Sequence, residues 1–266
     1  MTIMIHPGTL RSRAIALAAL AVVAASAAPA SAAVTYVFKG AITGGYDETG
    51  VFGLAGQQLD GLGLTFTATI VRNDVAGAMY DSGPGFSSVG GFRDKSPLQA
   101  TIDVNGKTFA FGSYLGQQGQ DEDPNGCGPG CSTEQFVFNA QAYHDIVDPI
   151  SGVTSFLNNG LLLGGTGVYT NFLPSTDYHT LGSLTGADGV DFFGELFLES
   201  YTLDAVGGRT AYSRGVATLK PISLTVSGSD APPAAVPEPA SWALMILGFG
   251  SAGAMLRSRR LTAVLA

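Results

Sequence analysis

The 266-residue sequence contains little charge, two cysteines, three histidines and a single tryptophan. Charged residues make up 13% of the chain, which is about half the share found in ordinary globular proteins. Because 45% of the residues are hydrophobic, this low charge excludes intrinsic disorder, which requires the opposite balance. The 37 glycines keep no three-residue period, so a collagen-like chain is excluded as well. Few Lys and Glu beside many Gly, Ser and Thr favour a turn-rich β protein over a helical one.

The sequence also lacks the motifs of common enzyme classes. No G-x-S-x-G, H-E-x-x-H, phosphate-loop or dinucleotide fingerprint occurs. Only His144 and His179 lie between residues 33 and 236. Two carboxylate pairs could serve a glycosidase if their members faced each other: Asp188 with Asp191, and Glu195 with Glu199. With so many acids in the chain, solvated loops are the better explanation of these pairs, so we predict no enzymatic activity.

Charge is distributed unevenly along the chain. Between residues 33 and 236, eight basic residues stand against 20 acidic ones, a net charge of −12. An acidic surface repels phosphate backbones, which excludes nucleic acid as a partner. The same acidity suits an exported domain or one that gathers divalent cations.

Residues 1–32 predict a secretory signal peptide with a signal helix. Arg11 and Arg13 supply the positive region, and residues 14–25 form an apolar run of suitable length. Ala30 and Ala32 flank Ser31 in a small-x-small cleavage site, which predicts a mature chain that begins at Ala33.

The C-terminal end predicts a transmembrane helix. A Pro/Ala linker over residues 230–236 leads into residues 237–239, and residues 240–256 then carry no charge. Seventeen helical residues span about 25 Å, the short limit for crossing a bilayer. Trp242 falls at the outer interface, and the arginines after the helix belong on the cytoplasmic side. Residues 33–239 are therefore expected outside the cytoplasm, and the cytoplasmic membrane holds the chain before processing.

Over residues 237–260 the tail resembles the PEP-CTERM sorting signal. The residues that carry this resemblance are Pro237, Glu238, Pro239, Trp242, Ala243, Arg257, Arg259 and Arg260. The Trp-Ala pair matches the PEPxxWA subclass. The resemblance implies recognition by an exosortase, a membrane-embedded processing enzyme of Gram-negative bacteria that make exopolysaccharide. Residues 44–53 are also similar to the N-terminal segment of many PEP-CTERM cargo proteins, a similarity that implies no activity.

Residues 33–229 predict one antiparallel β-sandwich domain, jelly-roll-like, in an all-β chain. Residues 64–70 and 98–104 alternate apolar and polar side chains, as half-buried strands do. Asn105-Gly106 predicts a type I′ turn that pairs Ile102 with Phe109. Residues 157–163 fit a helical turn or a strand equally well. Further strands are expected at residues 35–38, 136–142, 192–198, 210–219 and 222–226.

The only two cysteines, Cys127 and Cys131, predict a structural disulfide, because an even count in an exported chain favours a disulfide. Just before them, Asp121, Asp123 and Asn125 match positions 1, 3 and 5 of a calcium loop. The closing carboxylate is missing at its usual position, although Glu134 lies two residues farther on. A weak calcium site and a solvated acidic loop therefore both remain open; no other cofactor is expected.

Nine tyrosines could stack on sugars or serve as ordinary strand residues: Tyr36, Tyr46, Tyr80, Tyr114, Tyr143, Tyr169, Tyr178, Tyr201 and Tyr212. We expect an exported, exosortase-sorted protein of the cell surface or extracellular matrix, with a non-catalytic structural or adhesive role associated with exopolysaccharide. Its expected partners are the secretion machinery, the exosortase and exopolysaccharide. A calcium-dependent carbohydrate-binding module and a secreted hydrolase are the two other hypotheses.

Overall fold

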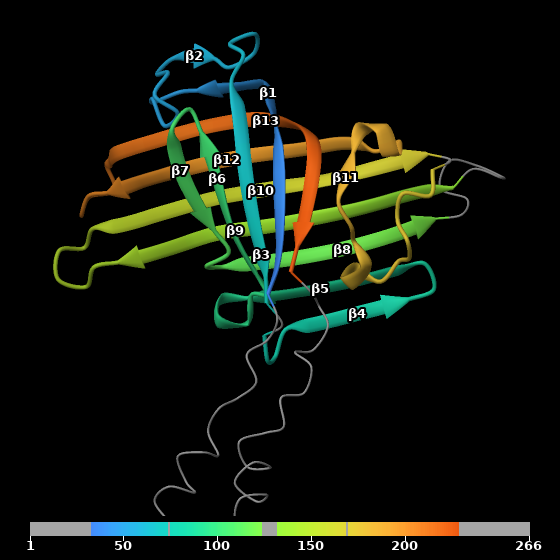
Figure 1. Ribbon diagram of the computed structural model, residues 1–266. Helices are drawn as coiled ribbons and strands as arrows, with labels where there is room; N and C mark the ends of the chain where they lie inside the picture. Colours follow the sequence, from blue (N-terminus) through green and yellow to red (C-terminus); the bar gives the residue numbers. More distant parts are fainter. Residues whose placement is uncertain (1–32, 74, 124–131, 169, 229–266) are drawn as a thin grey trace, which may run out of the picture. The chain divides into compact units, whose positions relative to one another are not determined.

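Thirteen strands hydrogen bond into one antiparallel sheet in the part of the chain that the computed structural model describes, residues 33–73, 75–123, 132–168 and 170–228 (Figure 1). The strands are β1 (Val34–Asp47), β2 (Gln57–Gln58), β3 (Thr65–Arg72), β4 (Met79–Gly83), β5 (Phe86–Phe92), β6 (Leu98–Val104), β7 (Lys107–Phe111), β8 (Leu115–Asp123), β9 (Thr133–Val147), β10 (Thr154–Val168), β11 (Leu184–Thr185), β12 (Asp191–Leu203) and β13 (Arg209–Ser227). Three short 3₁₀ helices complete the regular structure described: η1 (Arg93–Lys95), η2 (Tyr178–Thr180) and η3 (Gly186–Asp188).

The sheet folds over itself into two layers. Its strand order is β4-β5-β8-β9-β10-β12-β13-β1-β3-β6-β7, with β2 beside β1 and β11 beside β13. Figure 1 shows β1, β3, β6 and β7 lying across β8, β9, β10 and β12, and β6 and β7 contact β8, β9 and β10. We call the layer of β4, β5, β8, β9, β10 and β12 the wide layer, and the layer of β1, β3, β6 and β7 the crossing layer.

Strand β13 joins the two layers because it belongs to both. Its first half pairs with β12 up to Leu219, and its second half pairs with β1 as far as Ser227. Close to this point the register of the β1–β13 pair shifts, between Lys39 and Gly40. A Cβ on Gly40 would lie 2.3 Å from the Lys220 carbonyl oxygen, so only glycine permits this approach of the two backbones. Such irregularities are how strands pass from one layer to another.

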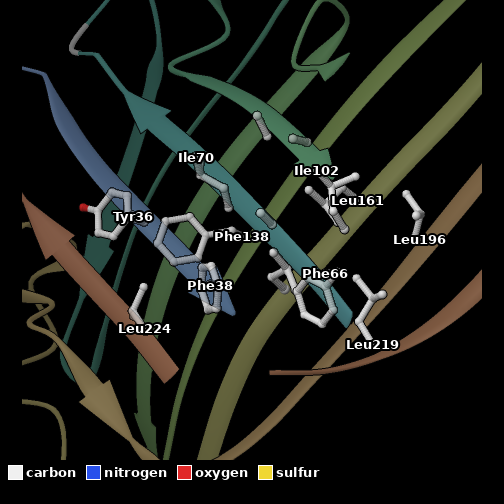
Figure 2. Close-up of a cluster of buried hydrophobic side chains, with 14 of the residues drawn as sticks. Tyr36, Phe38, Phe66, Ile70, Ile102, Phe138, Leu161, Leu196, Leu219 and Leu224 are labelled. Carbon is white, nitrogen blue, oxygen red and sulfur yellow. The ribbon is translucent and has the colours of Figure 1, made fainter. Parts of the chain in front are cut away.

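The core fills the space between the layers (Figure 2). Phe38, Ile70 and Ile102 come from the crossing layer, and Phe138 and Leu161 come from the wide layer. The rings of Phe38 and Phe138 meet edge to face with centroids 5.7 Å apart. An aromatic pair in this geometry contributes about 1 kcal/mol beyond its buried area. Alternate residues of β6 are buried, as the pattern of a half-buried strand requires.

The prediction of an all-β, antiparallel sandwich-like fold is confirmed, although its layers are parts of one continuous sheet. The predicted hairpin is confirmed as well: Ile102 pairs with Phe109, and Asn105 and Gly106 both have positive φ. Residues 157–163, which fitted two structures, lie in β10. The predicted signal helix and transmembrane helix fall outside the described residues. Within the described residues, no helix is long and apolar enough to cross a membrane.

A buried carboxylate organises the segment after β1. Asp47 is fully buried, and its two carboxylate oxygens accept hydrogen bonds from the backbone N–H groups of Gly50, Phe52 and Leu54 at 3.0, 3.0 and 2.8 Å. These bonds tie residues 48–54 to the end of β1 and place Phe52 in the core. The segment at residues 44–53 therefore has a structural role in closing this end of the fold.

Candidate functional site

Five aromatic rings form a continuous row on the outer face of the wide layer. They are Phe92 at the end of β5, Tyr114 just before β8, Tyr143 on β9, Phe156 on β10 and Tyr201 on β12. Successive ring centroids lie 5.7, 5.1, 5.7 and 4.5 Å apart. We call these five rings the aromatic strip.

Strand register places the strip on one face. Phe156 pairs with Asp145 of β9 on one side and with Tyr201 of β12 on the other. Tyr143 lies two residues before Asp145 and so points to the same face. Tyr114 is held by its backbone, whose N–H donates to the carbonyl of Gln141 at 3.0 Å and whose carbonyl accepts from the N–H of Arg93 at 2.8 Å.

The rings are open to solvent to different degrees. Phe92 is 49% exposed and Tyr143 is 38% exposed, whereas Tyr114, Phe156 and Tyr201 are half-buried. An exposed aromatic ring is normal when it stands alone, but a contiguous row of exposed and half-buried rings is typical of an interaction site.

An arginine of β13 lies at the Tyr201 end of the strip. The Arg209 guanidinium lies 4.5 Å from the ring centroid of Tyr201 and 5.0 Å from that of Tyr212. A bulge makes this arrangement possible: the β12–β13 ladder passes from Ser200 to Thr202 with a register shift, and Ala211 has φ +48°. Within the described residues, no carboxylate lies within ion-pair distance of Arg209, which is exposed.

Polar side chains border the strip. Asn158 pairs with Tyr143 and with Glu199, so amide and carboxylate groups share the face with the rings. One row farther along the strands, a shallow pocket of about 230 Å³ is lined by Asn139, Gln141, Gly160, Leu161, Leu162, Glu195 and Phe197. The outer face of the wide layer therefore combines ring surfaces with hydrogen-bonding groups.

A second hollow lies beside the β4–β5 hairpin. It has a volume of about 390 Å³, and its lining includes Tyr80, Asp177 and His179. His179 Nδ1 lies 2.6 Å from an Asp177 carboxylate oxygen. Burial raises the pKa of Asp177, but hydrogen bonds from the backbone and ring of His179 and the charge of Arg72 outweigh burial and lower it below its ordinary value. Within the described residues, no hydroxyl is hydrogen bonded to His179 Nε2, as a Ser-His pair would require.

Beneath this hollow, Arg72 is buried and holds the two layers and a loop together. Its guanidinium donates to the Tyr36 hydroxyl at 2.8 Å, to Gln118 Oε1 at 2.9 Å and to the Tyr178 carbonyl at 3.2 Å. Tyr36 belongs to the crossing layer and Gln118 to the wide layer. These contacts serve the packing of the fold.

The predicted calcium ligands are only partly within the described residues. Asp121 and Asp123 end β8, on the strand face that also carries Gly119, while Asn125 lies outside the described residues. Glu134 is buried and faces the other way, and its carboxylate accepts the N–H groups of Phe172 and Leu173 at 2.7 and 3.2 Å. Within the described residues, no group of three His, Cys, Asp or Glu side chains could hold a metal ion. Calcium binding stays a prediction.

Several other predicted residues also lie outside the described part of the chain. These are Cys127 and Cys131 of the disulfide, Ala30 and Ala32 of the signal-cleavage site, and the whole sorting segment at residues 237–260. Ala33, the predicted first residue of the mature chain, directly precedes β1 and is exposed. The disulfide and the cleavage site stay predictions.

The members of the two carboxylate pairs have separate surroundings. Asp188 accepts hydrogen bonds from the backbone and hydroxyl of Thr185, and Asp191 forms an ion pair with Lys220. Glu195 and Glu199 lie on one face of β12 but four residues apart, which is about 13 Å along a strand. Glycosidase pairs are separated by about 5–10 Å.

The sequence singled out part of the strip. Tyr114, Tyr143 and Tyr201 were among the candidate sugar-stacking tyrosines, whereas Phe92 and Phe156 were missed. Residues 154–159 do not alternate polar and apolar side chains, so no local pattern marks Phe156 as a member of a strand face. By contrast, Tyr36 and Tyr178 are buried.

Comparison with known families indicates where the chain is sent in the cell. Residues 235–260 match the PEP-CTERM protein-sorting motif. A chain with this motif is exported, is anchored in the membrane before processing and is a substrate of an exosortase. Comparison with curated proteins gives no match to the chain. Assignment to the PEPxxWA subclass stays a prediction.

Proposed function

We propose that the chain is a cell-surface or extracellular-matrix protein with a non-catalytic, adhesive role in association with exopolysaccharide. The sorting motif at residues 235–260 supports the export step of this proposal. The β domain then supplies the contact with the matrix, and processing by exosortase leaves that domain at the cell surface.

The aromatic strip is the observation that carries the proposal. Sugar rings have apolar C–H faces and polar hydroxyl edges, and protein sites that bind them offer aromatic surface with hydrogen-bonding groups beside it. The outer face of the wide layer offers both, with Tyr143 and Tyr201 in the strip and Asn158 and Gln141 beside it. A shallow open face suits a long polymer better than a small substrate, which is usually enclosed in a deep cleft.

A co-sedimentation experiment tests the proposal. The full chain, purified in detergent, is mixed with insoluble exopolysaccharide prepared from an exopolysaccharide-producing Gram-negative bacterium. We expect the chain to sediment with the polysaccharide and the polysaccharide to keep its chain length during incubation. A chain that stays in the supernatant would contradict adhesion, and a shortened polysaccharide would contradict the non-catalytic role.

The same experiment with a calcium chelator distinguishes the proposed adhesive role from a calcium-dependent carbohydrate-binding module. Asp121 and Asp123 are the described members of the predicted calcium loop. Adhesion by the strip does not require a metal ion, so we expect equal sedimentation with chelator and with added calcium. Loss of sedimentation in chelator would instead support a calcium-dependent carbohydrate-binding module.

A further inference from the structure

We propose that the aromatic strip binds a linear, neutral polysaccharide, which lies across the strands from Phe92 to Tyr201 and ends against Arg209. This inference rests on the proposed function and specifies both the site and the chemical class of its ligand. Three features carry it: the length of the strip, the charges around it and the position of Arg209 against two tyrosine rings.

The length of the strip suits a polymer. The rings cross from β5 to β12, a distance of four strand spacings or about 19 Å. Several consecutive sugar rings fit over this length. Because the face of an aromatic ring is electron-rich, it attracts the weakly positive C–H hydrogens of a pyranose face. The row crosses the strands, so the polymer axis is expected to run across the sheet.

The surrounding charges favour a neutral ligand. Residues 33–236 carry a net charge of −12. On the strip itself, exposed Asp145 pairs with Phe156, and Glu199 lies two residues before Tyr201 on the same face. At the other end of the strip Arg93 directly follows Phe92, but Asp94 stands next to it, and Arg214 is 3.4 Å from the Glu48 carboxylate. A polymer of uronic acids would place its carboxylates beside these acids and be repelled.

Arg209 is placed to bind hydroxyl groups at the end of the strip. Its guanidinium lies against the rings of Tyr201 and Tyr212, which restricts its side chain before any ligand arrives. The N–H groups at the edge of the guanidinium remain able to donate hydrogen bonds. Asn158 and Gln141 offer amides on the same face. Hydroxyl-rich neutral sugars satisfy all of these donors and acceptors.

Affinity measurements with defined polymers test the inference. The full chain in detergent is titrated with a soluble neutral β-glucan, a neutral galactomannan, alginate and polygalacturonate, each at low and at high ionic strength. We expect binding to at least one neutral polymer, with an affinity that changes little with salt, and no binding to the two polyanions. Salt insensitivity follows because no charge pair forms with a neutral sugar.

Variants locate the site. Tyr143→Ala and Tyr201→Ala are expected to lower the affinity for the neutral polymer about tenfold or more each, as loss of an aromatic anchor does. Tyr201→Phe keeps the ring and is expected to bind within about twofold of the unchanged chain. Tyr80→Ala is the matched control, because Tyr80 is also an exposed tyrosine of this sheet but lies on the edge strand β4, outside the strip.

The outcomes separate this inference from the proposed function. Binding to no polysaccharide at all, including crude exopolysaccharide, would contradict the proposed function itself. Salt-sensitive binding to alginate or polygalacturonate would leave the proposed function standing and overturn the neutral ligand. Neutral binding that Tyr143→Ala and Tyr201→Ala leave unchanged would overturn the site. Sedimentation velocity completes the test: a dimer that Tyr201→Ala disperses, with glycan binding unchanged, would assign the strip to a second copy instead.

Discussion

Phe156 and Tyr201 stack across β10 and β12, with ring centroids 4.5 Å apart and an angle of 19° between the ring planes. The two residues are directly paired in the ladder, so the stack is built by strand register. The Arg209 guanidinium lies 4.5 Å from the centroid of the Tyr201 ring. An aromatic pair, a cation and a bulged strand therefore meet at one point of the outer face, at the β12–β13 end of the strip.

This stack predicts a measurable coupling. Phe156→Ala and Tyr201→Ala, made singly and together, are expected to show an interaction energy of about 0.5–1.5 kcal/mol in the free energy of unfolding. Chemical denaturation followed by fluorescence provides the three values. Additive effects of the two substitutions would mean that the rings do not support each other in solution.

Asp47→Ala is expected to lower the free energy of unfolding by about 3 kcal/mol, because three N–H groups lose a charged acceptor in a buried setting. Asp47→Asn retains one acceptor oxygen and is expected to lose less. Thermal and chemical unfolding measure both effects. Asp60→Ala, at an exposed position, serves as the control and is expected to stay within about 0.5 kcal/mol. Equal losses at both positions would contradict the role given to Asp47.

Gly40→Ala is expected to destabilise the fold by about 3 kcal/mol, because its Cβ would overlap the backbone of Lys220 and Pro221. Gly160→Ala is the matched strand control. A Cβ at Gly160 meets no atom within 4 Å, so alanine there is expected to raise the free energy of unfolding by about 0.5–1 kcal/mol. Chemical denaturation tests both variants. A tolerated Gly40→Ala would show that β1 and β13 are farther apart than described.

Acid pH is expected to remove a contribution that Asp177 makes to stability. The folded chain holds the pKa of Asp177 below the ordinary value of 3.8, so the unfolded chain binds this proton more readily. The contribution is therefore fully present above the unfolded pKa and is lost as pH falls through the lower folded value. Melting temperatures recorded from neutral to acid pH should fall more steeply for the unchanged chain than for Asp177→Asn. Parallel curves would contradict this assignment.

Local features of the fold could be predicted from the sequence, whereas features that depend on distant pairing could not. Asn105-Gly106 defines its own turn through positive φ, so the β6–β7 hairpin followed from neighbouring residues alone. The close approach of Gly40 to Lys220 depends on a residue far along the chain and has no local signal. The continuous sheet, in place of two separate sheets, follows from the pairing of β13 with both β12 and β1.

The candidate site, too, could be predicted from the sequence only in part. The sequence predicted a strand at residues 136–142 and offered Tyr143 as a tyrosine that could stack on sugars or serve as an ordinary strand residue. These rings form one strip only because the register of five strands makes them neighbours, and that register depends on pairing between distant parts of the chain. The position of Arg209 beside the strip depends on a bulge at Ala211. Ala211 is a non-glycine residue with positive φ, which no sequence rule anticipates.

Whether the strip binds a neutral polysaccharide is decided by the affinity of the full chain for a soluble neutral β-glucan or galactomannan, compared among the unchanged chain, Tyr201→Ala and Tyr201→Phe. We expect salt-insensitive binding to at least one of these polymers, with an affinity that falls about tenfold or more in Tyr201→Ala and is kept in Tyr201→Phe. Equal affinities for all three chains, or binding confined to uronate polymers, would contradict it.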